Sequence, residues 1–428
     1  NSNEARARLD RLIKRTDADF DNPIIAKNPF GTMENSFYFY FHTSFRCMIR
    51  YTITVEDEMI SDHIRYVNNG QENNLTKEHE FLVDGLIPGR TNFIVIELVD
   101  STGNTRETQN YQYTAGAAPS GIPQKITAND GYSKSTISNG MYYVFPSGKS
   151  WVAVYDNKGI LRGLIPTESY HGRRITASED CILYQISNNK IAKVSSLGRV
   201  TGVIQMKGYG EIRDFSYDGY NEVYWLGKKK KNEYLLATSF QTGKTRVVYR
   251  FKKGIFAGSL TAPQSGTIGV VAKNPSGLIY LDAITAAKPK ISFVVGKKAS
   301  WKKVVAKKKI KEDKKFTGWN TKQSMLLAQE NETAPAMLVQ EGNQYLAVEW
   351  QADVAKKTVQ KKTSATAAEA KSGSQLQKRG NNYVIVCGRA GTYLEMGTDG
   401  KAIRRYNYGS GLDSVQKLTL SGMCFYGI

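Results

Sequence analysis

One recurring hairpin constrains the fold of this chain more than any other sequence feature. Val154–Ile165 predicts a strand that ends at Tyr155, a tight turn over residues 156–159 and a second strand from Ile160. Asn and Asp tolerate left-handed backbone angles and Gly adopts them freely, so an Asp-Asn-Lys-Gly turn favours a hairpin. Similar stretches recur at 193–204, 238–249 and 394–406, and a looser one at 280–295. Their spacing of about 40–45 residues is the period of a four-stranded propeller blade.

The chain divides into four parts by composition and pattern. Residues 1–27 hold an amphipathic helix over Ser2–Arg15 and a polar connector. Residues 28–115 carry short alternating strands separated by Gly, Pro and Asn turns, which is typical of a β-sandwich. Residues 116–121 are a linker of small residues, and the blade pattern fills 122–428. We therefore predict an all-β protein with a sandwich and a propeller of about six blades.

The chain is strongly basic, with a formal net charge of +20. Much of this charge lies in two lysine-rich segments, near 297–315 and 355–379, which we expect to be insertions on one face of the propeller. Such runs are usually solvated loops, and the functional alternative is attraction to an anionic polymer or a sulfated ligand. No nucleic-acid-binding motif accompanies them, so specific nucleic-acid recognition is not expected.

Other features exclude whole classes of function. The four cysteines have no Cys-x-x-Cys spacing, so we expect no metal site, and we expect no cofactor. Cys387 and Cys424 both lie in strand-like runs, and a disulfide between them and two buried thiols remain equal alternatives. No run of about 18 apolar residues is present, so we predict no transmembrane segment. Residues 1–4 lack the features of a signal peptide, so any signal or anchor would lie outside this chain.

Several segments resemble the bacterial aryl-sulfate sulfotransferases. Residues 28–31 (Asn-Pro-Phe-Gly) are similar to that family's Asn-Pro-Tyr-Gly, and 81–92 to its Gly-Leu-Tyr-Pro-x-x-x-Asn stretch. Residues 155–162 look like its Asp-Asn-x-Gly-x-x-Arg-Trp, and 380–385 with Glu395 and Gly400 match its last blade. The resemblance implies an immunoglobulin-like sandwich followed by a six-bladed propeller, in an extracytoplasmic protein that is periplasmic, secreted or on the cell surface. It also implies sulfuryl transfer between phenols, without a nucleotide donor, through a histidine nucleophile.

The sequence departs from this family at the expected catalytic positions. His42, His63 and His79 lie in the sandwich, and only His171 lies in the propeller. Where the family has histidines, this chain has Glu211–Ser216, Phe256–Thr261 and Trp319–Ser324. Loss of a covalent nucleophile costs several orders of magnitude in rate, so sulfuryl transfer is not expected. His171 is the weak catalytic candidate, with a structural loop histidine as the alternative. The candidate anion-binding residues are Arg173, Arg213, Lys273 and Lys322.

Three hypotheses follow for the function. The first is a non-catalytic, arylsulfotransferase-like protein that binds anionic surface partners or takes part in protein assembly. The second is an active aryl-sulfate sulfotransferase with a diverged site, using His171 or another nucleophile. The third is homodimerisation, or packing into a larger surface structure, through the sandwich, because exposed sheet edges are docking sites.

Overall fold

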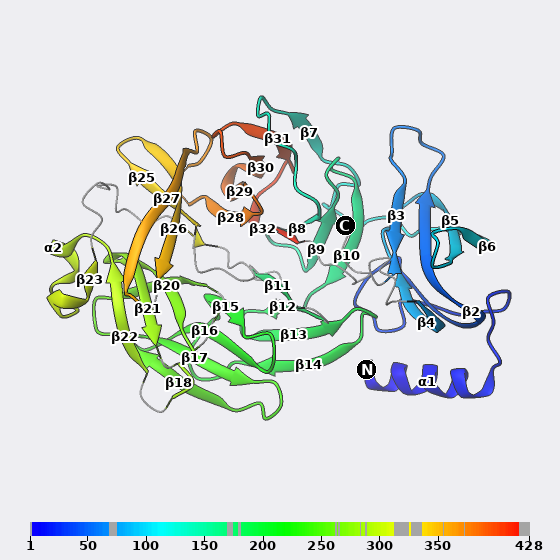
Figure 1. Ribbon diagram of the computed structural model, residues 1–428, viewed down its shortest axis with the longest axis horizontal. Coiled ribbons are helices and arrows are strands. Elements are labelled where there is room, and N and C mark those ends of the chain that lie inside the picture. Colours follow the sequence, from blue (N-terminus) through cyan, green and yellow to red (C-terminus); the bar gives the residue numbers. More distant parts are fainter. Residues whose placement is uncertain are drawn as a thin grey trace.

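The computed structural model describes most of the chain and is dominated by β-strands (Figure 1). The described residues are 2–67, 75–168, 174–178, 181–261, 263, 266–282, 284–286, 289–311, 325–326, 336–353, 355–371 and 373–418. None of the helices among them is long and apolar enough to cross a membrane. The all-β prediction is confirmed at this level.

The N-terminal part is a helix beside a small two-sheet domain. It comprises α1 (Ser2–Arg15), β1 (Ile24–Lys27), β2 (Phe37–Thr54), β3 (His63–Tyr66), β4 (Thr76–Val83), β5 (Thr91–Val99) and β6 (Thr105–Thr114). The first half of β2 pairs with β1 and β4, and its second half pairs with β3 and β5. The sequence pattern predicts only short strands here, but β2, with 18 residues, crosses both sheets. The segment expected as a connector contributes β1.

The rest of the described chain forms six sheets that follow one another round a common centre (Figure 1). The first contains β8 (Met141–Pro146), β9 (Trp151–Tyr155), β10 (Leu161–Pro166) and β32 (Leu412–Leu418). The second contains β11 (Ile175–Ser178), β12 (Cys181–Ser187), β13 (Lys190–Ser195) and β14 (Val200–Gln205). The third contains β15 (Asp214–Tyr217), β16 (Glu222–Lys229), β17 (Asn232–Ser239) and β18 (Thr245–Arg250).

The remaining three sheets are less regular. The fourth contains β19 (Phe256–Leu260), β20 (Ile268–Asn274), β21 (Ser276–Asp282), β22 (Lys290–Val295) and β23 (Ile310–Lys311). The fifth contains β25 (Ala336–Glu341), β26 (Gln344–Asp353) and β27 (Thr358–Thr366). The sixth contains β24 (Met325–Leu326), β28 (Gln375–Arg379), β29 (Asn382–Cys387), β30 (Thr392–Met396), β31 (Ala402–Asn407) and β7 (Thr127–Asp130). The short helices are α2 (Lys298–Trp301), η3 (Lys307–Lys309) and η4 (Gly388–Ala390).

The two ends of this region exchange strands between the first and last sheets. β7 pairs with β31 of the last sheet, and β32 pairs with β8 of the first. All six residues of β8 and of β29 are buried. Such continuous burial is typical of sheets that are covered on both faces. The core therefore lies between neighbouring sheets.

The two lysine-rich segments, both predicted as insertions, have different structures. Residues 355–379 were expected as an insertion but supply β27 and β28, which pair within sheets. Lysines at alternate strand positions point to solvent, so a lysine-rich run is compatible with a strand. Residues 297–311 do form an added segment, with α2, η3 and β23, and residues 312–315 lie outside the described part.

Candidate functional site

The predicted site residues fall partly outside the described structure. His171, Arg173 and Lys322 all lie outside the described residues. Arg213 is described, and its guanidinium binds the Glu233 carboxylate and the Ala257 carbonyl. It also lies 4.3 Å from the centre of the Phe256 ring. Because the charge of Arg213 is already balanced by Glu233, little of it is left for an external anion.

A buried ion pair lies beside Arg213 where the second, third and fourth sheets meet. Arg174 Nε is 3.4 Å from Asp214 Oδ1, and both side chains are almost fully buried. Arg174 also donates to the carbonyls of Phe215, at 3.2 Å, and Leu260, at 3.4 Å. Asp214 accepts the backbone N–H groups of the same two residues, at 3.0 and 2.8 Å. Burial raises the pKa of Asp214 to about 6 although Arg174 lowers it, with a smaller lowering from the predicted site residue Lys273.

Glutamine side chains join other neighbouring sheets in the same way. Gln416 of β32 exchanges two hydrogen bonds with the backbone of Ile175, at 2.8 and 2.9 Å. Gln377 of β28 does the same with the backbone of Lys417, at 2.7 and 3.0 Å. An amide side chain offers the same donor and acceptor as a peptide group. Each glutamine therefore makes a pair of hydrogen bonds like those between adjacent strands, but here the pair joins two neighbouring sheets. The buried polar groups described here are thus used for structure.

The hairpin at 154–165 has the predicted form and a structural task. Its turn lies between β9 and β10, with Gly159 at a φ of 77°. Asp156 accepts the N–H groups of Lys158 and Ile160 and pairs with Arg162 at 3.0 Å. Asn157 accepts a 2.7 Å hydrogen bond from Lys417 Nζ. The residues that resemble the family motif therefore shape the turn, and the Asn157 carbonyl also accepts hydrogen bonds from Arg404 and Tyr406 of the last sheet.

Lys417 and Glu395 form a fully buried pair between the first and last sheets. Their Nζ and Oε2 atoms are 2.8 Å apart. Lys417 also donates to the Ser138 carbonyl, at 2.6 Å, and Glu395 accepts from the hydroxyl of Tyr142, at 2.7 Å. Asn382 donates to Glu395 Oε1 at 2.6 Å. No sequence pattern indicates a buried Lys417, because a lysine in an alternating strand is usually a surface residue.

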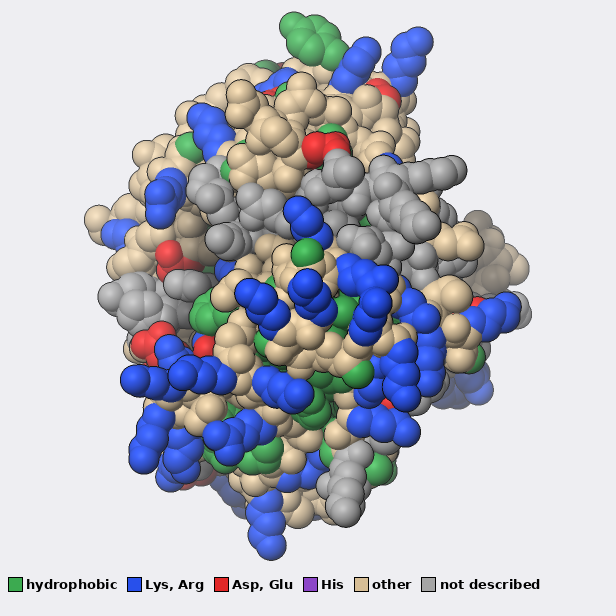
Figure 2. Space-filling view, turned by 90° about the vertical axis from the view of Figure 1, so that its left-hand side faces the viewer, with side chains coloured by type: hydrophobic (Ala, Val, Ile, Leu, Met, Phe, Trp, Pro, Cys, Tyr) green, Lys and Arg blue, Asp and Glu red, His purple; other side chains and the backbone are tan. Residues whose placement is uncertain are grey.

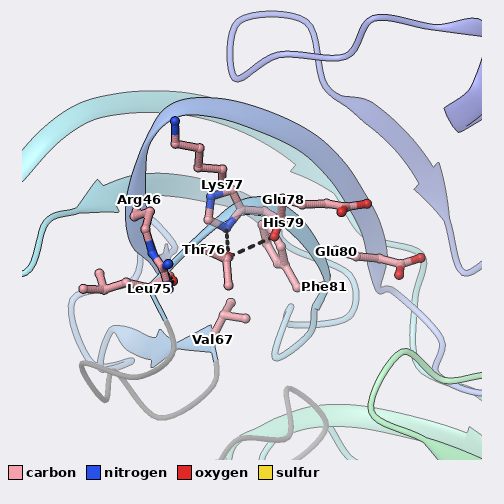
Figure 3. A pocket seen from close by; sticks show the side chains of 9 residues that line it. All are labelled: Arg46, Val67, Leu75, Thr76, Lys77, Glu78, His79, Glu80 and Phe81. Carbon is pink, nitrogen blue, oxygen red and sulfur yellow. Dashed lines mark hydrogen bonds between the residues drawn. The ribbon is translucent and has the colours of Figure 1, made fainter.

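A pocket of about 820 Å³ lies in the N-terminal domain beside β4 (Figure 3). Its lining includes Arg46 and His79, and the His79 Nδ1 lies 3.4 Å from the Thr76 hydroxyl. On its other side, His79 Nε2 is 3.1 Å from Thr43 Oγ1 and 3.4 Å from Cys47 Sγ. Burial lowers the pKa of His79 to about 4, so its imidazole is neutral at pH 7. The ring joins β4 to the irregular part of β2, where the pairing register shifts.

Lysines gather at one end of the third and fourth sheets. Strands alternate in direction, so the β16–β17 turn, the segment after β18 and the segment after β22 lie at the same end. We call the exposed lysines of these segments the lysine surface: Lys228, Lys229, Lys230, Lys231, Lys252, Lys253, Lys297, Lys298, Lys302, Lys303, Lys307 and Lys308. Figure 2 shows lysine and arginine side chains gathered on this side of the molecule.

One tryptophan fixes much of the lysine surface to the core. Trp301 of α2 is fully buried and donates to the Ser276 carbonyl at 3.0 Å. It belongs to the same apolar cluster as Phe251 and Ile255. A Cβ atom on Gly296 would lie 2.3 Å from the Trp301 Nε1, so the close approach requires glycine there. The lysine segment around α2 is thereby fixed to the same core as the segment after β18.

The cysteines and acidic groups give no metal site in the described part. Cys47, Cys181 and Cys387 are buried free thiols, and Cys424 lies outside the described residues. The disulfide between Cys387 and Cys424 and the alternative of two buried thiols are therefore both untested. Among the described residues, no group of three or more His, Cys, Asp and Glu side chains is placed to hold a metal ion.

Comparison with known proteins supports a relationship to the arylsulfotransferases through the N-terminal domain. Residues 24–116 match the family model described as the arylsulfotransferase Ig-like domain. No curated protein matches the chain.

Solved structures that the comparison matched to this chain include TolB from Acinetobacter baumannii and BamB from Moraxella catarrhalis. TolB has 14% identity and a TM-score of 0.41, covering 78% of this chain and 79% of that one. BamB has 10% identity and a TM-score of 0.31, covering 90% of this chain and 98% of that one. A nidogen/laminin complex has 9% identity and a TM-score of 0.42, covering 65% of this chain and 97% of that one. We take no function from similarities this low.

Proposed function

We propose that this protein is a non-catalytic, arylsulfotransferase-like binding module that holds an extracytoplasmic anionic polymer on its lysine surface. In this proposal residues 28–115 are the immunoglobulin-like domain, 116–121 the linker and 122–428 a six-bladed propeller. The six sheets and their exchanged terminal strands support the blade count. The match of residues 24–116 to the arylsulfotransferase Ig-like domain supports the family relationship.

The lysine surface is the observation that carries the proposal. Its three segments, 228–233, 250–255 and 296–311, contain one acidic residue, Glu233, and that carboxylate is buried against Arg213. The three segments therefore carry a large excess of positive charge. Like charges held side by side attract a polyanion over a distance of about 10 Å at moderate salt. The lysine ammonium group is a compact charge, whereas the planar guanidinium of arginine binds one anion through two fixed hydrogen bonds. Compact, flexibly held charges suit a polymer of repeated sulfate or carboxylate groups.

The binding test uses dextran sulfate, with neutral dextran as the uncharged comparison. We expect the Lys229→Gln/Lys230→Gln/Lys231→Gln variant to bind dextran sulfate about tenfold more weakly, at about 0.5 kcal/mol per lysine. Titration at low and high salt should also show a weaker salt dependence for this variant.

A matched variant removes the same charge from the other end of the molecule. Arg11, Lys14 and Arg15 are exposed on α1, far from α2 in Figure 1. The Arg11→Gln/Lys14→Gln/Arg15→Gln variant should bind dextran sulfate like the unaltered protein. Equal weakening in both variants would show that net charge, and not the lysine surface, attracts the polymer.

A second experiment tests the absence of sulfuryl transfer. We expect no phenol release when the protein is incubated with an aryl sulfate donor and a phenol acceptor, because the described Arg174, Asp214 and Arg213 are all engaged in structural contacts. Release is followed by the absorbance of the phenolate. Activity that disappears in His171→Ala would contradict the proposal and favour a diverged active enzyme.

A further inference from the structure

A small polar cavity lies between the N-terminal domain and the first sheet, away from the lysine surface. The N-terminal domain lines it with Met33, His63, Arg65, Asp84 and Gly85, and the first sheet with Met141, Val154, Arg162 and Gly163. Its volume of about 10 Å³ is room for one water-sized particle. A polyatomic oxoanion such as sulfate is too large for it.

Arg162 and His63, which line this cavity, each have a buried polar atom without a hydrogen-bond partner among the described residues. Arg162 uses Nε to bind Asp156, at 3.0 Å, and Nη2 to bind the Ser61 carbonyl, at 2.7 Å, which leaves Nη1 without a partner. His63 Nε2 is also without a partner. Both residues are more than nine-tenths buried. An unsatisfied buried polar group is unfavourable, so a bound species that forms hydrogen bonds with both atoms is favoured.

The His63 ring is fixed in place by the backbone beneath it. A Cβ atom on Gly85 would lie 2.3 Å from the His63 Cδ2, so the ring packs directly on this glycine. Burial, together with the positive charges of Arg162 and Arg65, holds the pKa of His63 well below its ordinary range. The imidazole is therefore neutral, and Nε2 can either donate or accept a hydrogen bond.

Asp84 decides the charge of the cavity. Its carboxylate balances Arg65, as Asp156 balances Arg162. The Tyr51 hydroxyl donates to Asp84 Oδ1 at 2.8 Å. The buried Tyr143 hydroxyl is close enough for the charges of Asp84 and Arg65 to shift its pKa. Burial raises the pKa of Asp84 to about 6, against the lowering effect of Arg65. When Asp84 takes a proton from solvent, the net charge of the cavity becomes more positive by one unit.

We propose that this cavity binds a single halide-sized anion, which enters as Asp84 takes up a proton. The anion accepts hydrogen bonds from Arg162 Nη1 and His63 Nε2 and replaces the charge lost from the Asp84 carboxylate. Because Arg162 also holds the Ser61 carbonyl, the anion joins the two domains at one point. A ligand that binds the folded state but not the unfolded state stabilises the protein more as the ligand concentration rises.

The test is a crystal structure of the full chain grown in sodium bromide at about pH 5 and at about pH 8, on either side of the Asp84 pKa. We expect an anomalous bromide peak within hydrogen-bond distance of Arg162 Nη1 at the lower pH and a strongly reduced peak at the higher pH. A water molecule without anomalous signal at both pH values would overturn the proposal.

An Asp84→Asn variant separates the anion from other effects of acid. Asparagine keeps an oxygen for the Tyr51 hydroxyl and carries no charge, so it imitates the protonated carboxyl. We expect its bromide peak at about pH 8 to equal that of the unaltered protein at about pH 5. If the variant binds no bromide at either pH, the proposal is wrong. Thermal unfolding at the lower pH, in bromide against gluconate of equal ionic strength, gives the same comparison in solution, and an equal Tm in both salts would also contradict it.

Discussion

Lys417→Met will lower the free energy of unfolding by about 3–5 kcal/mol, because it leaves the Glu395 carboxylate buried without its cation. Glu395 keeps the hydrogen bonds from Tyr142, Asn382 and the Ser138 backbone, but their charges are only partial. Methionine also removes the bonds that Lys417 makes to Asn157 and Ser138. Denaturant unfolding followed by tryptophan fluorescence measures the loss.

Two comparisons make this prediction specific. The Lys417→Met/Glu395→Gln variant should be more stable than Lys417→Met alone, since it removes the uncompensated charge. Lys356→Met removes a lysine from an exposed ion pair with Asp353 and should change stability by less than about 0.5 kcal/mol. If Lys417→Met is as harmless as Lys356→Met, the buried pair does not hold the first and last sheets together.

The pH dependence of stability gives a second signature of the same pair. Burial alone would raise the pKa of Glu395, but Lys417 and the hydrogen bonds outweigh it and hold the pKa below the ordinary value of 4.5. A lowered pKa in the folded state means that this stabilisation is present above about pH 4.5 and is lost as the pH falls further. The decrease in the free energy of unfolding below about pH 4.5 should be smaller in Glu395→Gln. If this decrease is unchanged in the variant, other carboxylates cause it.

How much of this structure could be predicted differs between local and long-range features. The hairpin over Val154–Ile165 depends on turn chemistry within a few residues, and its strands and turn are confirmed. The helix over Ser2–Arg15 depends on local periodicity and is also confirmed. The lysine-rich segment 355–379 was misjudged because charge content alone cannot separate a solvated strand from a loop.

The buried polar groups between sheets and between domains could not be predicted, because their partners come from distant parts of the chain. Lys417 contacts Asn157 and Ser138 only because the C-terminal strand β32 pairs with β8 of the first sheet. Asp214 lies within Glu211–Ser216, a segment without the histidines that the family resemblance implies. The sequence contains no local signal that Asp214 would be buried against Arg174. The same holds for the cavity at Arg162, since its other wall is about 100 residues away in the chain.

Arg174→Met is the second change with a large expected effect, also about 3–5 kcal/mol, because it leaves Asp214 buried with only two backbone N–H donors. It removes the bonds to Phe215 and Leu260 as well, so contacts between three consecutive sheets weaken together. Hydrogen exchange should show the loss first in β15 and β19. Arg90→Met, at an exposed pair with Asp57, is the matched control and should show little change.

The sign of the pH effect distinguishes this site from the Lys417 pair. The pKa of Asp214 is already raised to about 6 in the folded protein, and loss of Arg174 raises it further. A folded state that holds a proton more tightly than the unfolded chain loses stability as the pH rises. Arg174→Met should therefore be least stable above pH 7 and partly recover towards about pH 4, in the opposite direction to Glu395. Asp214→Asn in the same background should remove this dependence, and a pH profile that stays parallel to that of the unaltered protein would contradict the ion pair.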